Sequence, residues 1–289
     1  MKLIKSFLKY QQERFPLLFL FPISLSGVIG AAAILGHHNW ITIISATFVT
    51  VAFIFHVRVI DEIRDFLHDT EFHPDRPVQK KTISIKELKI LRLISLFVFF
   101  GISIFFSLKT FILAVLVFLY SSLAGYDFFC SKKIRKYFYA YNLLNMVQLV
   151  GLQLIVYTMF GWNYTFTPIT ISHILIVFLL SSLLEVGRKI KLVDKETFGK
   201  DTYSAHLGFR GAIILFSVIF ILALSPLGYI LSINGKLYGL AIPSFVAVLG
   251  LYISVTHHFK KTIQSEKLFA LFYFIYYIII NITLYTLIK

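Results

Sequence analysis

Apolar stretches of about twenty residues recur along this 289-residue chain. A helix crosses the hydrocarbon core of a bilayer with about 20 mostly apolar residues, whereas a half-buried strand alternates apolar and polar residues. Nine stretches fit a membrane helix, and 58% of all residues are hydrophobic. We therefore expect an all-α integral membrane protein with nine transmembrane helices in one bundle. The stretches are 15–35, 40–60, 90–108, 111–129, 140–160, 170–187, 210–232, 237–256 and 268–287.

The chain shows no repeat, low-complexity segment or soluble region, so we expect a single membrane domain over residues 1–289. Basic residues before the first apolar stretch imitate a secretory signal peptide. The stretch 15–35 is too long for the apolar core of such a peptide, and we interpret it as a retained helix. Residues 1–14 alternate apolar and basic side chains, which predicts a short amphipathic helix lying on the membrane surface.

The distribution of charge predicts an orientation. If the N-terminus is cytoplasmic, 25 of the 28 Lys and Arg residues fall on the cytoplasmic side, as do all 14 Asp and Glu residues. Only Lys109, Lys236 and Lys289 fall outside. Because cytoplasmic loops of membrane proteins are enriched in Lys and Arg, we expect a cytoplasmic N-terminus, an external C-terminus and a location in the cell (plasma or inner) membrane.

The net charge of +14 has the same origin, so we expect the lipid bilayer and no nucleic acid as a partner. Cys130 is the only cysteine. An intrachain disulfide and a zinc site built from cysteines are therefore excluded.

The first group of ionisable residues follows the second apolar stretch. Four acids stand there at spacings of three and four residues, which place them on one broad face of a helix end. Neighbouring carboxylates repel each other unless a cation joins them, and Mg²⁺ takes oxygen ligands. We expect these acids to bind Mg²⁺; the alternative is a solvated loop neutralised by Arg58, Arg64 and Arg76. The four acids are Asp61, Glu62, Asp65 and Asp69.

The second group follows the sixth stretch. Glu185 lies near the end of an apolar stretch, where a carboxylate needs a partner, and Arg188 and Lys189 are within helical reach. This arrangement fits either ion pairs at the membrane interface or a functional site, with Asp194 and Asp201 further along.

A third loop carries Lys132 and Lys133. Their simplest interpretation is the excess of basic residues that is typical of cytoplasmic loops in membrane proteins. Beside two acidic loops, they could also bind a diphosphate.

Nearly the whole chain resembles the UbiA-type superfamily of intramembrane prenyltransferases. The resemblance covers the nine stretches, the acidic motifs after the second and sixth of them, and the predicted cytoplasmic side of both motifs. The first motif of the family reads N-D-x-x-D-x-x-x-D and is followed by a segment like R-P-L. The corresponding residues here are Asp61-Glu62-x-x-Asp65-x-x-x-Asp69 and Arg76-Pro77-Val78.

The second motif departs from the family pattern, which is D-x-x-x-D. Glu185 stands at the first acidic position and Lys189 at the second. Asp194 or Asp201 would have to replace the lost ligand if a second metal site exists. Because lysine does not ligate a metal while it is protonated, Lys189 would instead bind the diphosphate as a point charge, next to Arg188.

The resemblance implies a prenyltransferase, a transferase of alkyl groups other than methyl, that needs Mg²⁺. It would transfer a prenyl group from an isoprenyl diphosphate to an aromatic or other lipophilic acceptor. The implied metal ligands are Asp61, Glu62, Asp65 and Asp69, with Glu185, Asp194 and Asp201 as further candidates. The implied diphosphate-binding residues are Arg58, Arg76, Lys132, Lys133, Arg188 and Lys189. The residue that removes the final proton is not identified.

Three alternatives stay open. An intramembrane terpene cyclase of the same superfamily would act on the diphosphate alone. A transporter would place polar groups near the middle of the membrane, whereas these stretches carry almost no charge at their centres. A non-catalytic relative would keep the fold without the reaction.

Overall fold

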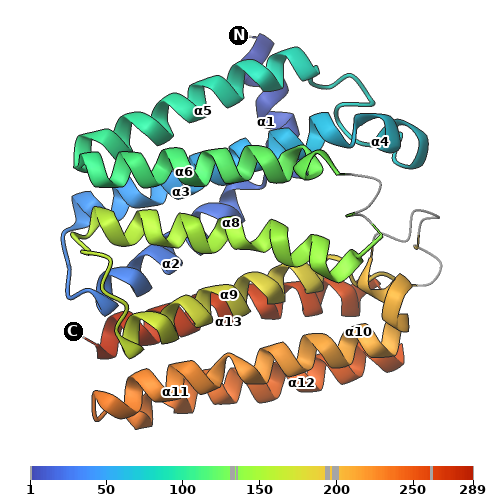
Figure 1. The fold of residues 1–289 in the computed structure, drawn as a ribbon. Helices are drawn as coiled ribbons and strands as arrows, with labels where there is room; N and C mark the ends of the chain where they lie inside the picture. The colour runs from blue at the N-terminus through green and yellow to red at the C-terminus, as the bar shows by residue number, and fades with distance from the viewer. Residues whose placement is uncertain are drawn as a thin grey trace. The chain divides into compact units, whose positions relative to one another are not determined.

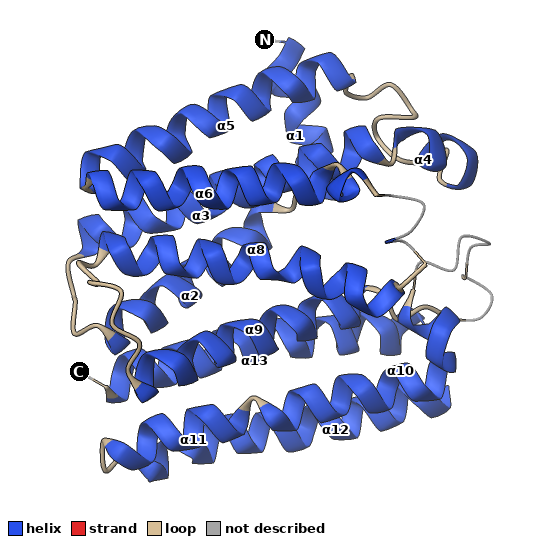
Figure 2. Ribbon diagram, in the orientation of Figure 1, coloured by secondary structure: helices blue, strands red, loops and turns tan. Residues whose placement is uncertain are grey.

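The computed structural model describes residues 2–130, 134, 136–192, 196, 202–260 and 263–288. Within these residues every regular element is a helix (Figure 2). The elements are α1 (Lys2–Arg14), α2 (Leu17–Ile34), α3 (Trp40–Arg64), α4 (Phe66–Phe72), α5 (Ile85–Phe106), α6 (Leu108–Gly125), η1 (Asp127–Phe129), α8 (Phe138–Met159), α9 (Pro168–Arg188), α10 (Tyr203–Leu222), α11 (Leu224–Ile233), η3 (Leu237–Leu240), α12 (Ala241–Lys260) and α13 (Ile263–Leu287).

Eight helical segments of the described chain are long and apolar enough to cross a membrane, and they coincide with the first eight predicted stretches. The protein is a multi-pass helical membrane protein. Large apolar side chains on its surface fit this conclusion, because Phe97 and Phe105 of α5 are 82% and 85% exposed. The ninth predicted stretch lies in α13, whose apolar part Leu271–Leu287 is shorter than the other spans. Nine spans therefore stays a prediction.

The contacts divide the chain into two compact units, 1–28 with 39–162 and 29–38 with 163–289. In the first unit, α3 packs against α5, α5 against α6, and α6 against α8 (Figure 1). In the second unit, α9 contacts α10, α11 and α13, and α12 lies along α13 (Figure 1). This division does not test the prediction of a single membrane domain over residues 1–289.

The helix α1 packs onto the first unit through one of its faces. Tyr10 and the following Phe15 are buried in one core with Phe55 and Val59 of α3. The opposite face stays open, since Leu8 is 53% exposed. A helix, Lys2–Arg14, thus covers the segment predicted to be amphipathic. Its position on the membrane surface stays a prediction.

Side-chain caps begin several of the helices. Asn39 accepts a hydrogen bond from the backbone of Ile41 at the start of α3. At the start of α5, Ser84 and Glu87 each accept a bond from the other's backbone, which is a capping box. These caps satisfy backbone N–H groups that a helix start leaves without partners.

Candidate functional site

The acids of the first motif lie where α3 ends and α4 begins. Asp65 stands between the two helices with φ −93° and ψ 9°. One turn earlier, α6 approaches α3 closely, because a Cβ atom at Gly125 would overlap the side chain of Ile60. The close approach of two helices at a small residue fixes this end of α3 in the first unit.

Asp61 and Asp65 converge on one cationic atom. The Nη2 atom of Arg64 lies 2.9 Å from Oδ1 of Asp61 and 2.9 Å from Oδ2 of Asp65. The two carboxylate side chains are 32% and 30% exposed, so solvent and ligands can reach them. The pair is therefore an accessible oxygen site that holds a positive charge.

Glu62 faces a different set of partners. Its Oε1 atom lies 2.7 Å from Nη2 of Arg58 and 2.9 Å from Nε of Arg14, and it accepts a hydrogen bond from the Tyr10 hydroxyl. Burial, and then the carboxylate of Glu62, raises the pKa of the Tyr10 phenol well above its ordinary value. The phenol therefore remains a proton donor to Glu62. The side chain of Glu62 is 1% exposed, and its Oε2 atom has no hydrogen-bond partner in the described chain.

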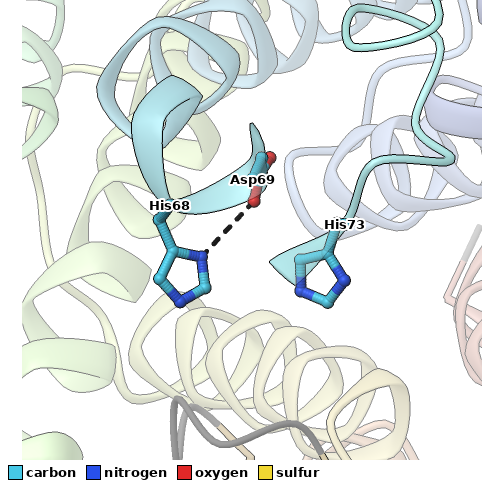
Figure 3. Close-up of side chains that lie close together, drawn as sticks. All are labelled: His68, Asp69 and His73. Carbon is cyan, nitrogen blue, oxygen red and sulfur yellow. Dashed lines mark ion pairs between the residues drawn. The ribbon is translucent and has the colours of Figure 1, made fainter. Parts of the chain in front are cut away.

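Asp69, in α4, is the second buried acid of the motif. Its Oδ2 atom pairs with Nη1 of Arg76, and its Oδ1 atom lies 3.6 Å from Nδ1 of His68. The described residues contain one group of three side chains placed to hold a metal ion, and it consists of His68, Asp69 and His73 (Figure 3). The sequence predicted one broad face for the four acids. The structure instead divides them into the pair Asp61 and Asp65, Glu62 with two arginines, and Asp69 with Arg76.

Asp127, in η1, is an acid that the sequence did not single out as a ligand. It is buried, accepts a hydrogen bond of 3.1 Å from the Tyr141 hydroxyl, and lies 3.9 Å from Nη1 of Arg64. Asp127 and the next two residues, Phe128 and Phe129, all have positive φ. Such strained backbone conformations cluster at functional sites. A lone Asp after an apolar helix is the only sequence signal for this residue.

The second motif lies at the C-terminal end of α9, in the second unit. Glu185 pairs with both basic residues that follow it: Oε2 is 2.6 Å from Nε of Arg188, and Oε1 is 2.8 Å from Nζ of Lys189. Ion pairs, one of the two alternatives for this group, are thus present. Beyond the helix, Glu196 accepts hydrogen bonds from Thr202 and Ser204. Four predicted site residues, Lys132, Lys133, Asp194 and Asp201, lie outside the described residues.

The comparisons with known proteins identify the family and the fold. The model of the UbiA prenyltransferase family matches residues 19–278. The chain belongs to the UbiA prenyltransferase family. Two solved structures share its fold. The apo structure of a UbiA homolog from Aeropyrum pernix K1 has a TM-score of 0.69 at 14% identity, covering 91% of this chain and 96% of the other.

The second solved structure is described as a digeranylgeranylglyceryl phosphate synthase in membranes. It has a TM-score of 0.63 at 19% identity, covering 100% of this chain and 99% of the other. No curated protein matches the chain.

Membership of the UbiA family makes the protein a transferase of a family that is generally Mg²⁺-dependent and uses prenyl diphosphates. The residues at the end of α3 fit such an ion. Mg²⁺ in enzymes is usually bound by one or two carboxylates together with substrate phosphates and water. Asp61 and Asp65 provide two accessible carboxylates that already share one cationic atom.

Proposed function

We propose that this UbiA-family protein transfers a prenyl group from an isoprenyl diphosphate to a lipophilic acceptor, aromatic or otherwise. The observation that carries the proposal is the convergence of Asp61 and Asp65 on Nη2 of Arg64. Two carboxylates that share a cation at an accessible helix end are suited to a magnesium diphosphate. Family membership supplies the reaction class.

Asp61 and Asp65 are the proposed principal Mg²⁺ ligands. When bound, the ion would stabilise the negative charge that develops on the departing diphosphate. Glu62 and Asp69, the other two predicted ligands, are buried and paired with arginines, so their proposed contribution is to fix the motif. Arg64 now contacts both carboxylates. If a metal ion bound them instead, the guanidinium of Arg64 is proposed to contact phosphate oxygens.

Basic residues are proposed to bind the rest of the diphosphate. Lys189 offers a compact ammonium and Arg188 a forked guanidinium, and Glu185 holds both at one helix end. Lys132 and Lys133 are proposed to add further positive charge. Asp194 and Asp201 stay candidates for a second ion.

The reaction breaks the bond between the allylic carbon and the diphosphate oxygen, and the diphosphate keeps the electron pair. The acceptor then forms a bond to the allylic cation and loses a proton. Preorganised positive charge beside the diphosphate lowers the barrier to the first of these steps. A dry cavity among apolar helices would protect the cation from water.

The proposed orientation places both acidic motifs on the cytoplasmic side. Its support is the 25 of 28 basic residues that fall on that side in a nine-span topology. The diphosphate would then reach the motifs from the cytoplasm and the lipophilic acceptor from the bilayer.

The decisive experiment incubates the purified protein with Mg²⁺, labelled isoprenyl diphosphates and a membrane lipid extract, and identifies products by mass spectrometry. A product that carries both prenyl group and acceptor is the expected result. A cyclic hydrocarbon or cyclic alcohol formed from the diphosphate without extract would indicate a terpene cyclase instead. No turnover of any isoprenyl diphosphate would contradict the proposal.

A further inference from the structure

Two histidines flank the buried Asp69 around the C-terminal end of α4. His68 belongs to the helix, and His73 is the residue that follows it (Figure 3). Each of the three side chains offers one ligand atom, and these atoms all lie within 4.8 Å of one another. The candidate Mg²⁺ ligands Asp61 and Asp65 are not members of this group.

The end of the helix brings the two imidazoles together. Residues five apart do not share a helix face as closely as residues four apart. His73 leaves the helical conformation, with φ −138° and ψ 55°, while its backbone N–H still donates to the carbonyl of Asp69 over 2.9 Å. Its ring then lies 5.9 Å from the ring of His68, measured between centroids. Figure 3 shows the rings on either side of Asp69.

We propose that His68, Asp69 and His73 bind one divalent transition-metal cation of the zinc class. Imidazole nitrogen suits Zn²⁺ and its neighbours in the first transition row, whereas Mg²⁺ prefers oxygen ligands only. Two imidazoles and one carboxylate are three protein ligands. They leave a fourth tetrahedral position for water or a phosphate oxygen.

One ligand distance already matches a zinc site, and the others lie within 4.8 Å. Zinc–ligand bonds of roughly 2.0–2.2 Å at a tetrahedral angle place two ligand atoms about 3.4 Å apart. Nδ1 of His68 and Oδ1 of Asp69 are 3.6 Å apart. The side chain of His68 is 35% exposed, so an ion can reach it from solvent.

Arg76 fits this site as an outer partner. It pairs with Oδ2 of Asp69, while Oδ1 is the atom that faces His68. Carboxylates that ligate a metal through one oxygen are commonly hydrogen-bonded through the other, which fixes their orientation. The ion pair with Arg76 and the metal site therefore use different atoms of Asp69 and are compatible.

The site shares Asp69 with the first acidic motif, so its test measures metal binding directly and not transferase activity. Full-length protein without a histidine tag is titrated with Co²⁺ in the presence of excess Mg²⁺, and the visible absorption of the bound ion is followed. One Co²⁺ per chain is expected, and Zn²⁺ should displace it. Substitution His68→Asn or His73→Asn should weaken Co²⁺ binding by at least about tenfold.

Two controls separate the site from its neighbours. His37→Asn/His38→Asn removes an exposed histidine pair elsewhere and should leave Co²⁺ binding unchanged. Asp65→Asn should also leave it unchanged, because Asp65 belongs to the proposed Mg²⁺ site. Zn²⁺ should raise the unfolding temperature of the wild type but not of His68→Asn, since a ligand stabilises only the state that binds it.

Co²⁺ binding that persists in both histidine variants would overturn the proposal. Binding that disappears in Asp65→Asn would show that Co²⁺ occupies the carboxylate pair instead. A metal-free His68→Asn protein that unfolds at the wild-type temperature confirms that the comparison is made on a folded chain.

Discussion

Arg14 and Glu62 are 48 positions apart in the sequence, yet Nε of Arg14 donates to Oε1 of Glu62 over 2.9 Å. The contact ties the N-terminal helix α1 to the acidic motif at the end of α3. Arg58 approaches the same oxygen atom at 2.7 Å. Glu62 is thus an acid of the motif that is held between two guanidinium groups, and α1 supplies one of them.

The first prediction concerns this connection. Arg14→Ala should lower the free energy of unfolding by about 1–3 kcal/mol, because a buried carboxylate loses one of its charged partners and keeps only Arg58. Thermal unfolding in detergent measures the change. Arg14→Lys keeps the positive charge but not the forked guanidinium, so its free energy of unfolding should fall by less than that of Arg14→Ala.

The double variant Arg14→Ala/Glu62→Gln is the matched control for this pair. Together with the two single variants it forms a double-mutant cycle. If Arg14 acts through Glu62, Arg14→Ala should lower the free energy of unfolding less in the Glu62→Gln background than in the wild type. An equal loss in both backgrounds would show that Arg14 stabilises the protein through packing of α1 and not through Glu62.

The second prediction concerns the carboxylate pair. Asp65→Asn should abolish prenyl transfer, because a neutral amide is a weaker partner for Mg²⁺ than a carboxylate. Its stability should fall by about 1 kcal/mol or less, since the ion pair with Arg64 is partly exposed. Asp75→Asn is the matched control: that side chain is 92% exposed and paired with Lys80, so its removal should leave turnover intact. An active Asp65→Asn protein with unchanged Mg²⁺ dependence would contradict the prediction and would favour the alternative that the first motif is a solvated loop.

The sequence predicted the helices well because membrane spans depend on length and hydropathy alone. The ion pairs that Glu185 could form with Arg188 and Lys189 are also present, because their spacing of three and four residues brings them together on one helix. The four acids of the first motif were harder to place. Spacing suggests one face, but contacts from α1 and from the segment after α4 decide which acids are buried.

The residues that the sequence missed are partners from distant segments or from irregular backbone. Tyr10 and Arg14 contact Glu62 from another helix, and no local sequence pattern predicts this contact. His68 and His73 flank Asp69 in the sequence as H-D-x-x-x-H, which was a usable signal. Their proximity depends on the helix ending at Phe72, and helix ends are difficult to predict to the residue.

The third prediction concerns topology. Reporter fusions after Lys289 and within residues 161–169 should both report an external location. A fusion in the segment 74–82, between α4 and α5, is the control and should report the cytoplasm. The reason is the asymmetric distribution of Lys and Arg in the nine-span arrangement. A cytoplasmic signal after Lys289, with the other two fusions as expected, would mean that α13 does not cross the membrane.

The last prediction concerns the lysine at the second motif. Lys189→Ala should weaken the binding of an isoprenyl diphosphate even at saturating Mg²⁺, because an ammonium that would contact phosphate oxygens is lost. A nonhydrolysable diphosphate analogue allows the affinity to be measured without turnover. Lys236→Ala, which removes an exposed lysine before η3, is the control and should bind the analogue as the wild type does.

Glu185→Gln tests why Lys189 is positioned for this role. The carboxylate of Glu185 lies 2.8 Å from the ammonium of Lys189 and 2.6 Å from the guanidinium of Arg188. If Glu185 only orients these groups, its amide variant should bind the analogue more weakly but with an unchanged number of Mg²⁺ ions. If Glu185 is itself a metal ligand, the variant should bind one ion fewer. A complex with two Mg²⁺ ions, one of them held by Asp194 or Asp201, and with Lys189 turned to solvent would contradict the prediction. The two-metal arrangement would then persist in this chain despite the lysine at the second acidic position.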